Sequence, residues 1–244
     1  MKPNYLIIGM QKSATTSAER YLNQHPDIHC NWGEIHFFDR PENFKKGIKW
    51  YEDKLQTNKK FTGEKTPTYI FFKRSVNKIH KFYPNVKLII FLRDPVFRAY
   101  SHYNHMIQES QKGDKKFRMY INPKTTMSDI IKKDLKRKNY EVQRTVIQRG
   151  FYLEQIQYLL TKFKRSQIKI IIAEWYKKDP LKWNNEIYKF IGTYPLKQVK
   201  PQMQHKREYV IKIKEKEKKR LQKIYKKHNE RLFKFLGYKI PEWI

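Results

Sequence analysis

The stretch that decides the fold is YLIIGMQKSATTSAERYL, residues 5–22. An apolar run ends at Gly9, Lys12 follows three residues later, and Thr15 and Thr16 come just before a helical pattern. A strand that enters a loop and then a helix lets backbone N–H groups and the helix dipole converge on an anion. The common phosphate-binding loop ends in Gly-Lys-Ser/Thr, and this one does not. The stretch therefore predicts an anion site of unusual build at the end of a strand.

Apolar runs bounded by turn signals predict buried parallel strands at residues 5–9, 86–92 and 168–173. Helical patterns separate them: one over residues 15–23, one that begins after Pro95, and one just before the third strand. That last pattern has its apolar residues on one face, namely Tyr152, Ile156, Leu159, Leu160 and Phe163. The alternation predicts an α/β fold with a central, mostly parallel sheet flanked by helices. Since no Gly/Ser/Pro-rich linker divides the 244 residues, we expect a single domain over residues 1–244.

Two further segments have clear patterns. Residues 108–140 are polar, with QKGDKK and KKDLKRK, and predict a loop followed by a surface helix. Residues 208–237 predict a packed amphipathic helix or helix pair with Gly237 as its C-cap. Its apolar positions at helical spacing are Leu221, Ile224, Tyr225, Leu232, Phe235 and Leu236.

The composition is strongly basic. The 54 Lys and Arg residues against 23 Asp and Glu give a formal charge of +31, which attracts polyanions such as nucleic acid, anionic glycans and nucleotides. The heavy use of Lys, Ile and Asn is equally typical of a coding bias, in which case the lysines form a solvated surface. With 39% hydrophobic and 15% aromatic residues, the chain has the composition of a folded protein.

The single cysteine, Cys30, excludes an intrachain disulfide and a cluster of cysteine metal ligands, and we expect it in the core. The eight histidines show no metal-binding helical pattern, so no metal site is predicted. The N-terminus has neither a signal peptide nor a membrane span. We therefore expect a soluble, cytoplasmic protein, or a luminal catalytic domain that lacks its anchor.

A second anion site is predicted in LIIFLRDPVFRAYSHY, residues 88–103. Arg93 stands at the carboxyl end of a strand, where ligands gather in open α/β sheets. Asp94 and Pro95 suit the start of a helix, in which Ser101 lies two turns on. Arg93 and Ser101 together could hold one phosphate, so the two sites imply a ligand with two separated anionic groups.

Several motifs occur in the order of a known family: GMQKSATT (9–16), GEIHFFD (33–39), GEKTP (63–67) and FLRDPVFRAYSHY (91–103). The chain resembles the sulfotransferases that use 3′-phosphoadenosine 5′-phosphosulfate (PAPS), especially those that modify heparan-sulfate-like glycans. Residues 149–175 and HKREY (205–209) are also similar to later parts of that family. The resemblance implies a three-layer fold like that of P-loop nucleotide hydrolases.

The resemblance also implies how the donor is held. The loop would grip the 5′-phosphosulfate, and Lys12 would neutralise charge on the departing phosphate of the product PAP. Arg93 and Ser101 would hold the 3′-phosphate, and no metal would be required. The implied loop residues are Gly9, Gln11, Lys12, Ser13, Ala14, Thr15 and Thr16.

At the acceptor side, Glu34 matches the family's general base, which takes the acceptor's proton, and we expect its pKa to be raised. His36 would assist catalysis and, with Asp39, bind or orient the acceptor. Lys65 matches a lysine at the acceptor and transfer site.

Residues later in the chain match less closely. Lys206 and Arg207 resemble a basic loop that closes over the nucleotide, in which Lys206 would share the role of Lys12. Arg149 and Gly150 match a stretch near the 3′-phosphate or adenosine, and Tyr152 in the same stretch is a further candidate for nucleotide binding. Ala14 departs from the family because many relatives have glycine there, and alanine disfavours a positive φ.

Two alternatives stay open. A P-loop kinase would need ATP and Mg²⁺, against which the missing Gly-Lys-Ser/Thr ending counts. A nucleic-acid-binding protein would explain the charge and the many aromatic residues, although not the ordered motifs. The sulfotransferase hypothesis predicts an anionic or neutral glycan acceptor and no specific nucleic acid, and leaves the oxygen or nitrogen acceptor and the oligomeric state undecided.

Overall fold

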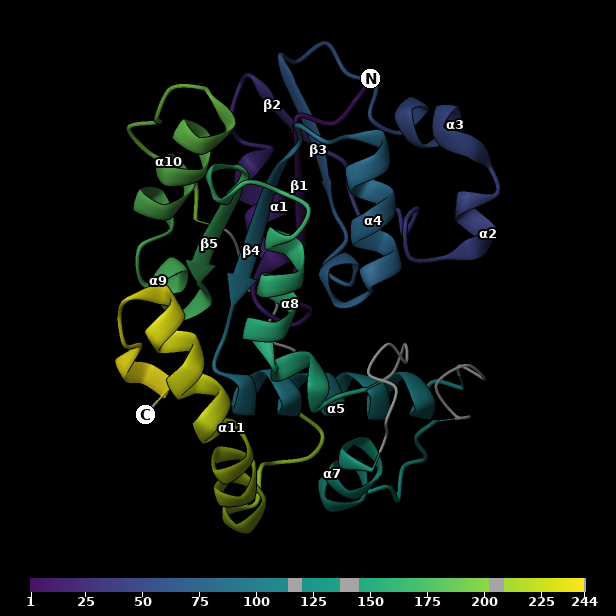
Figure 1. Ribbon diagram of the computed structural model, residues 1–244, viewed down its shortest axis with the longest axis vertical. Helices are drawn as coiled ribbons and strands as arrows, with labels where there is room; N and C mark the ends of the chain where they lie inside the picture. Colours follow the sequence, from purple (N-terminus) through teal and green to yellow (C-terminus); the bar gives the residue numbers. More distant parts are fainter. Residues whose placement is uncertain (114–119, 137–144, 202–208, 244) are drawn as a thin grey trace. The chain divides into compact units, whose positions relative to one another are not determined.

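The computed structural model describes residues 1–113, 120–136, 145–201 and 209–243. The chain packs into two compact units (Figure 1). The first unit comprises Met1–Arg93 and Ile156–His205, and the second comprises Asp94–Gln155 and Lys206–Ile244. The expectation of one domain over the whole chain stays a prediction.

The first unit contains a five-stranded parallel sheet in the order β2-β3-β1-β4-β5. The strands are β1 (Tyr5–Gly9), β2 (Ile28–Cys30), β3 (Phe61–Lys65), β4 (Lys87–Leu92) and β5 (Ile168–Ile172). The predicted α/β fold and three of these strands are therefore confirmed, with ends shifted by at most one residue. Sequence reasoning missed β2 and β3, since β2 has three residues and β3, with the sequence FTGEK, lacks a strongly apolar run.

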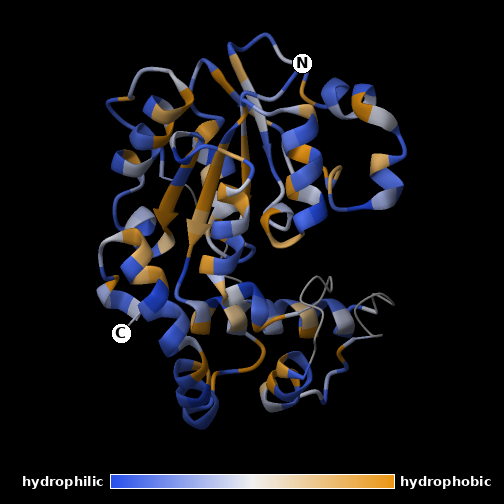
Figure 2. Cartoon of the chain, in the orientation of Figure 1, coloured by the Kyte–Doolittle hydropathy of each residue, from blue (hydrophilic) through white to orange (hydrophobic). Residues whose placement is uncertain are grey.

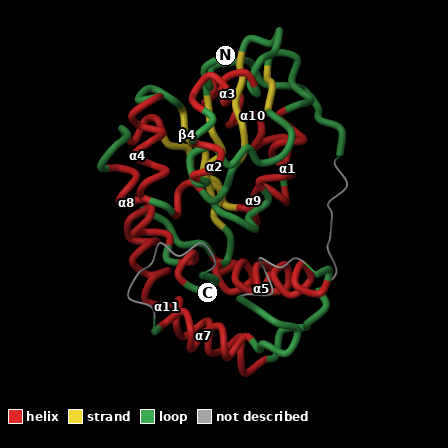
Figure 3. The backbone as a smooth tube through the Cα atoms, turned by 90° about the vertical axis from the view of Figure 1, so that its right-hand side faces the viewer, coloured by secondary structure: helices red, strands yellow, loops and turns green. Residues whose placement is uncertain are grey.

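Helices of the first unit cover both faces of the sheet (Figure 3). On one face, α1 (Thr15–Leu22), α9 (Ala173–Lys178) and α10 (Pro180–Ile191) pack against β1, β4 and β5, and Cys30 belongs to this core as expected. On the other face lie α4 (Lys73–Phe82) and residues 156–160 of α8 (Tyr152–Leu160). Because both faces are covered, β1, β4 and β5 are mostly apolar, as Figure 2 shows for β4 and β5, whereas β3 has buried polar residues. This is the expected three-layer arrangement.

Two short helices, α2 (Pro41–Phe44) and α3 (Gly47–Asp53), precede β3. A short 3₁₀ turn, η1 (Tyr69–Phe71), follows β3 and lies against the end of β1. Gly9 is needed at that point because a Cβ there would stand 2.5 Å from Cγ2 of Ile70. The glycine thus permits close packing of η1 on β1.

The second unit is helical in its described part. It contains α5 (Pro95–Gln111), α7 (Met127–Leu135), η2 (Gln148–Gly150), the start of α8, α11 (Glu215–Leu236) and η4 (Pro241–Trp243). The carboxylate of Asp94 accepts from the N–H groups of Val96 and Phe97 and caps α5, as predicted. The apolar sides of α5, α7 and α11 form one core cluster.

The helix ends in this unit follow the sequence pattern. Gly237 ends α11 with a φ of 80°, which confirms the predicted C-cap. Phe235, which the pattern placed on the packed face, is 37% exposed, and Phe233 is buried instead. The predicted surface helix between residues 108 and 140 corresponds to α7, which buries Ile130 and Ile131.

Two properties of the described ranges bear on localisation and cofactors. Within them, no helix is both long enough and apolar enough to cross a bilayer. The same residues contain no group of three or more His, Cys, Asp or Glu side chains arranged to hold a metal ion.

Candidate active site

The loop between β1 and α1, residues 9–16, turns sharply through left-handed backbone. Lys12 has a φ of 70° and Ala14 a φ of 68°. Alanine disfavours a positive φ, yet the backbone of this loop holds Ala14 at one. Ala14 is also the N-cap of α1, whose first helical residue is Thr15, and its side chain accepts no hydrogen bond from the helix. The free N–H groups at the start of α1 are thus left to other acceptors.

Two side-chain atoms of this loop are suited to a ligand. Oγ of Ser13 and Oε1 of Gln11 are buried, and neither has a hydrogen-bond partner among the residues the structure describes. A buried polar atom without a partner is costly, and a bound oxyanion would satisfy the Ser13 hydroxyl. The loop therefore fits an anionic group at the N-terminus of α1.

Arg93 lies at the carboxyl end of β4 and is tied to the same loop. Its Nη1 donates to the carbonyl oxygen of Lys12 at 3.0 Å. Lys177 in α9 is close enough that, together with burial, the charge of Arg93 lowers the pKa of Lys177. Cations thus gather at the carboxyl ends of β4 and β5, where the predicted second anion group would bind.

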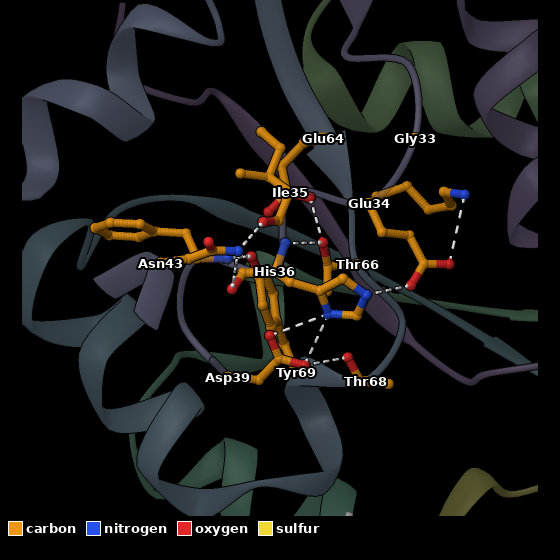
Figure 4. A network of polar contacts seen from close by, with 12 residues as sticks. Gly33, Glu34, Ile35, His36, Asp39, Asn43, Glu64, Thr66, Thr68 and Tyr69 are labelled. Atoms are coloured by element: carbon orange, nitrogen blue, oxygen red, sulfur yellow. Dashed lines mark hydrogen bonds and ion pairs between the residues drawn. The ribbon is translucent and has the colours of Figure 1, made fainter. Parts of the chain in front are cut away.

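A second loop, residues 33–39, carries a chain of ionisable groups (Figure 4). Oε2 of Glu34 lies 3.1 Å from Nε2 of His36. Nδ1 of the same ring lies 3.0 Å from Oδ2 of Asp39, and the hydroxyl of Thr68 donates to that oxygen at 2.6 Å. The imidazole is therefore held at both nitrogens by carboxylates.

The pKa values of these groups follow from the pairing. Burial by itself lowers the pKa of His36, but hydrogen bonds to Asp39 and Glu34 outweigh that effect and raise it to about 9. Burial by itself raises the pKa of Glu34, yet the hydrogen bond with His36 and the charge of Lys65 bring it below its ordinary value. The expectation of a raised Glu34 pKa is therefore wrong: at neutral pH, Glu34 is a carboxylate paired with an imidazolium.

Lys65, the last residue of β3, connects the two loops. Its Nζ lies 3.7 Å from Oε1 of Glu34 and 3.5 Å from Oγ1 of Thr16, at the start of α1. It also lies 3.5 Å from Oε2 of Glu19, whose other oxygen accepts from the N–H of Gly33 at 2.7 Å. One buried ammonium thus joins the anion loop to the carboxylate chain.

The remaining predicted residues lie elsewhere in the chain. In the second unit, Ser101 is half-buried in α5, Tyr152 is buried against Trp243, and Arg149 is buried with its Nε donating to the carbonyl of Thr145. Lys206 and Arg207 lie outside the described residues. The roles predicted for all five stay predictions.

Comparison with known proteins decides the family. The sequence model described as "Sulfotransferase domain" matches residues 2–240. The chain belongs to the sulfotransferase family. In the described part of this sulfotransferase domain, the loop of residues 9–16 and the loop of residues 33–39 lie at the same end of the parallel sheet, where the strands end and helices begin.

The sulfotransferase domain has characterised relatives. A bifunctional heparan sulfate N-deacetylase/N-sulfotransferase 4 of Mus musculus is 32% identical over 203 residues, covering 79% of this chain and 22% of that protein. A heparan sulfate glucosamine 3-O-sulfotransferase 5 of Mus musculus is 30% identical over 199 residues, covering 79% of this chain and 54% of that protein. The chain therefore spans between about a fifth and about half of the length of these relatives.

The fold has a solved counterpart. The crystal structure of a sulfotransferase from Alicyclobacillus acidocaldarius superimposes with a TM-score of 0.78 at 22% identity, covering 100% of this chain and 99% of that one. At that identity the likeness shows the fold, and it agrees with the architecture predicted from the sequence.

Sequence reasoning missed three residues of the site. Glu19 has no motif of its own, Glu64 was quoted within GEKTP without a role, and Trp32 was passed over. Trp32 comes two residues before Glu34 and is 64% exposed, which is unusual for tryptophan. The sequence could have indicated Trp32, because a tryptophan next to a predicted base is a candidate for substrate contact. Glu19 and Glu64 could be identified only from their contacts in the structure.

Proposed function

We propose that this domain transfers a sulfuryl group from PAPS to a hydroxyl or amine of a glycan. The observation that carries the proposal is Lys65, whose ammonium reaches both the start of the anion loop and the carboxylate of Glu34. Transfer between two bound substrates requires their two sites to lie within a few ångströms of each other. Because Lys65 at the end of β3 contacts both Thr16 and Glu34, the proposed donor and acceptor sites lie next to each other.

The donor would be held by the loop and by the end of β4. The residues proposed to fit it are Gly9, Gln11, Lys12, Ser13, Ala14, Thr15, Thr16 and Arg93. The support from geometry is the Ser13 hydroxyl, which has no hydrogen-bond partner among the residues that the structure describes. When bound, PAPS would supply an activated sulfuryl group on a phosphate that leaves as PAP. Lys12 would stabilise the negative charge that grows on this leaving phosphate. Ser101, Arg149, Tyr152, Lys206 and Arg207 are proposed as further nucleotide contacts on the strength of the family motifs.

On the acceptor side, Glu34 would remove a proton from the attacking hydroxyl or amine. Its lowered pKa keeps Glu34 ionised at neutral pH, so it can accept a proton, while the same lowering makes it a weaker base and leaves the proton transfer to depend on position more than on basicity. His36 holds Oε2 of Glu34 and is itself held by Asp39, so the carboxylate has a fixed direction. When Glu34 takes up a proton, the His36 imidazolium keeps a hydrogen bond to Asp39 and stays in place. We propose that His36, Asp39 and Lys65 also contact the acceptor.

The acceptor class is proposed from the relatives and the charge. Several relatives are named for heparan sulfate, two as N-deacetylase/N-sulfotransferases and others as glucosamine 3-O-sulfotransferases. A formal charge of +31 favours a polyanionic chain. The exposed ring of Trp32 offers an apolar face on which a sugar ring could stack close to Glu34.

The test is transfer of label from ³⁵S-PAPS to a panel of partly desulfated heparan sulfate, neutral polysaccharides and small-molecule acceptors, together with PAP binding by calorimetry. We expect transfer to at least one glycan without added metal, and PAP binding that Lys12→Ala weakens. If no acceptor takes up label and PAP does not bind, the proposal is wrong. ATP- and Mg²⁺-dependent transfer would instead favour a kinase.

A further inference from the structure

A buried carboxylate that the proposed reaction does not use lies behind the 33–39 loop. Glu64, in β3, is 0% exposed. Alternation along the strand directs Lys65 to one side, whereas Glu64 and Thr66 share the other side and hydrogen-bond to each other. Among the described residues, no cationic side chain forms an ion pair with Glu64. An unpaired buried carboxylate is costly, and burial raises its pKa to about 7 despite hydrogen bonds from Thr66 and Tyr69.

Hydroxyl groups surround this carboxylate. The hydroxyl of Thr66 donates to Oε2 of Glu64 at 2.7 Å. Tyr69 lies close enough to the same carboxyl group that each affects the other's pKa, and the hydroxyl of Tyr51 reaches Oε1 at 3.4 Å. An ionised carboxylate only accepts, so above a pH of about 7, where the ionised form of Glu64 predominates, it fixes the direction in which the hydroxyl protons point.

Two of these hydroxyls also bind the 33–39 loop. The N–H of His36 donates to Oγ1 of Thr66 at 3.3 Å, and the N–H of Phe37 donates to the hydroxyl oxygen of Tyr69 at 2.9 Å (Figure 4). Each hydroxyl has a single proton, so it accepts from the loop most favourably when that proton points to Glu64. Two consecutive peptide N–H groups of the loop are thus oriented through one buried carboxylate.

The loop needs this support at His36. His36 is left-handed, with a φ of 53°, which is uncommon for a residue other than glycine and persists only when surrounding contacts impose it. The direction of its backbone N–H decides where its ring lies between Glu34 and Asp39. We propose that Glu64 is a positioning residue that, through Thr66 and Tyr69, holds the His36 backbone and thereby directs Glu34 at the acceptor; its catalytic consequence rests on the proposed function.

The first test is Glu64→Gln, measured at pH 8 or above, where Glu64 is ionised; the isosteric change then replaces a pure acceptor by a group that also donates. One hydroxyl must then turn its proton away from Glu64, so its hydrogen bond from the loop is weakened. We expect kcat to fall tenfold or more, with the Kd for PAP within twofold of wild type. Thr66→Val and Tyr69→Phe should each lower kcat in the same way, and combining either with Glu64→Gln should add little, because all three act through one network.

Matched controls remove the same groups elsewhere in the sheet. Thr62→Val, in the same strand, deletes a buried hydroxyl that donates to the carbonyl of Leu55. Tyr188→Phe deletes a buried hydroxyl that donates to the carbonyl of Tyr21 on the other face. Both controls should leave kcat within twofold of wild type, even where they lower the melting temperature.

The second test does not require turnover. An NMR pH titration of labelled histidine, with His36→Gln to assign the signal, should show His36 titrating near pH 9 in the wild type. In Glu64→Gln, Thr66→Val and Tyr69→Phe, the midpoint should move down toward the ordinary 6.5, because the ring leaves its two carboxylates. An unchanged midpoint in all three variants would overturn the inference. If the wild type transfers no sulfuryl group, the proposed function fails, and this titration still decides the role of Glu64.

Discussion

The two loops of the candidate site differ in how far the chain itself satisfies them. In residues 33–39, Glu34, His36 and Asp39 are paired with one another and with Lys65 and Thr68. In residues 9–16, the buried polar atoms of Gln11 and Ser13 have no partner within the described ranges. The first loop is therefore preorganised without a ligand, whereas the second is built to be completed by one. Mutations should consequently separate catalysis from nucleotide binding.

The largest expected effect is in the carboxylate loop. Glu34→Gln should lower kcat by roughly 10²- to 10⁴-fold, the usual contribution of a general base. Labelled transfer and PAP calorimetry measure the two functions. Nucleotide binding should be unchanged, because the donor loop supplies its own contacts.

The matched control for that change is Glu186→Gln. Glu186 is a partly exposed glutamate of α10 that pairs with Lys169 of β5 at 2.8 Å. It should leave kcat and PAP affinity as they are. If Glu34→Gln abolished PAP binding as well, Glu34 would have to be reassigned to the nucleotide site.

In the donor loop, unlike the carboxylate loop, a mutation should weaken PAP binding. Lys12→Ala should weaken it by roughly 10- to 100-fold, from the 1.5–3 kcal/mol typical of a hydrogen bond to a charged group, and should lower kcat as well. Calorimetry checks this against Lys49→Ala, an exposed lysine that pairs with Asp53. Unchanged PAP affinity in Lys12→Ala would remove the distinction between the two loops.

Trp32 comes two residues before Glu34, and its exposed ring is the proposed stacking surface for the acceptor. Trp32→Ala should raise the KM for the glycan about tenfold, in the range of an exposed aromatic contact, and leave the Kd for PAP unchanged. Trp32→Phe should retain most of the affinity, since a flat ring remains. Leu135→Ala, which shortens an exposed apolar residue in α7, is the control for nonspecific effects. Equal KM values for Trp32→Ala and wild type would exclude stacking on this ring.

The ion pairs of His36 in residues 33–39 also predict that the stability of the domain depends on pH. The folded pKa of His36, about 9, lies above its ordinary 6.5, so its pairing contributes fully below pH 6.5 and is lost as the pH rises through 9. That contribution is on the order of 2 kcal/mol. Between pH 6 and 10 the free energy of unfolding of the wild type should therefore fall more than that of His36→Gln. Urea unfolding at each pH measures it, and parallel curves would contradict the pairing.

The sequence predicted the local structure of residues 9–16 better than that of residues 33–39, for a physical reason. Strand, glycine, lysine and threonines are consecutive in residues 5–16, so the strand, loop and helix follow from local geometry, whereas the proposed donor binding stays a prediction. The carboxylate loop depends on Lys65 and Glu64 from β3 and on Glu19 from α1, which only the fold brings together. Without those contacts, the Glu34 pKa was predicted in the wrong direction. β2 and β3 were missed for a related reason, because their pairing comes from neighbouring strands more than from their own residues.

The smallest expected effect concerns Ala14, which holds a left-handed conformation at the N-cap of α1. An alanine in that region costs roughly 1–2 kcal/mol, and a glycine there avoids this cost but loses more entropy on folding. Ala14→Gly should therefore stabilise the domain by about 0.5–1 kcal/mol, or a few degrees in melting temperature. Ala18→Gly, in the buried interior of the same helix, should instead destabilise it by about 1 kcal/mol or more. Opposite signs at two alanines four residues apart would show that position 14 favours glycine for its backbone conformation alone. A loss of stability in Ala14→Gly would instead mean that the Ala14 methyl group makes a contact worth more than the relieved strain.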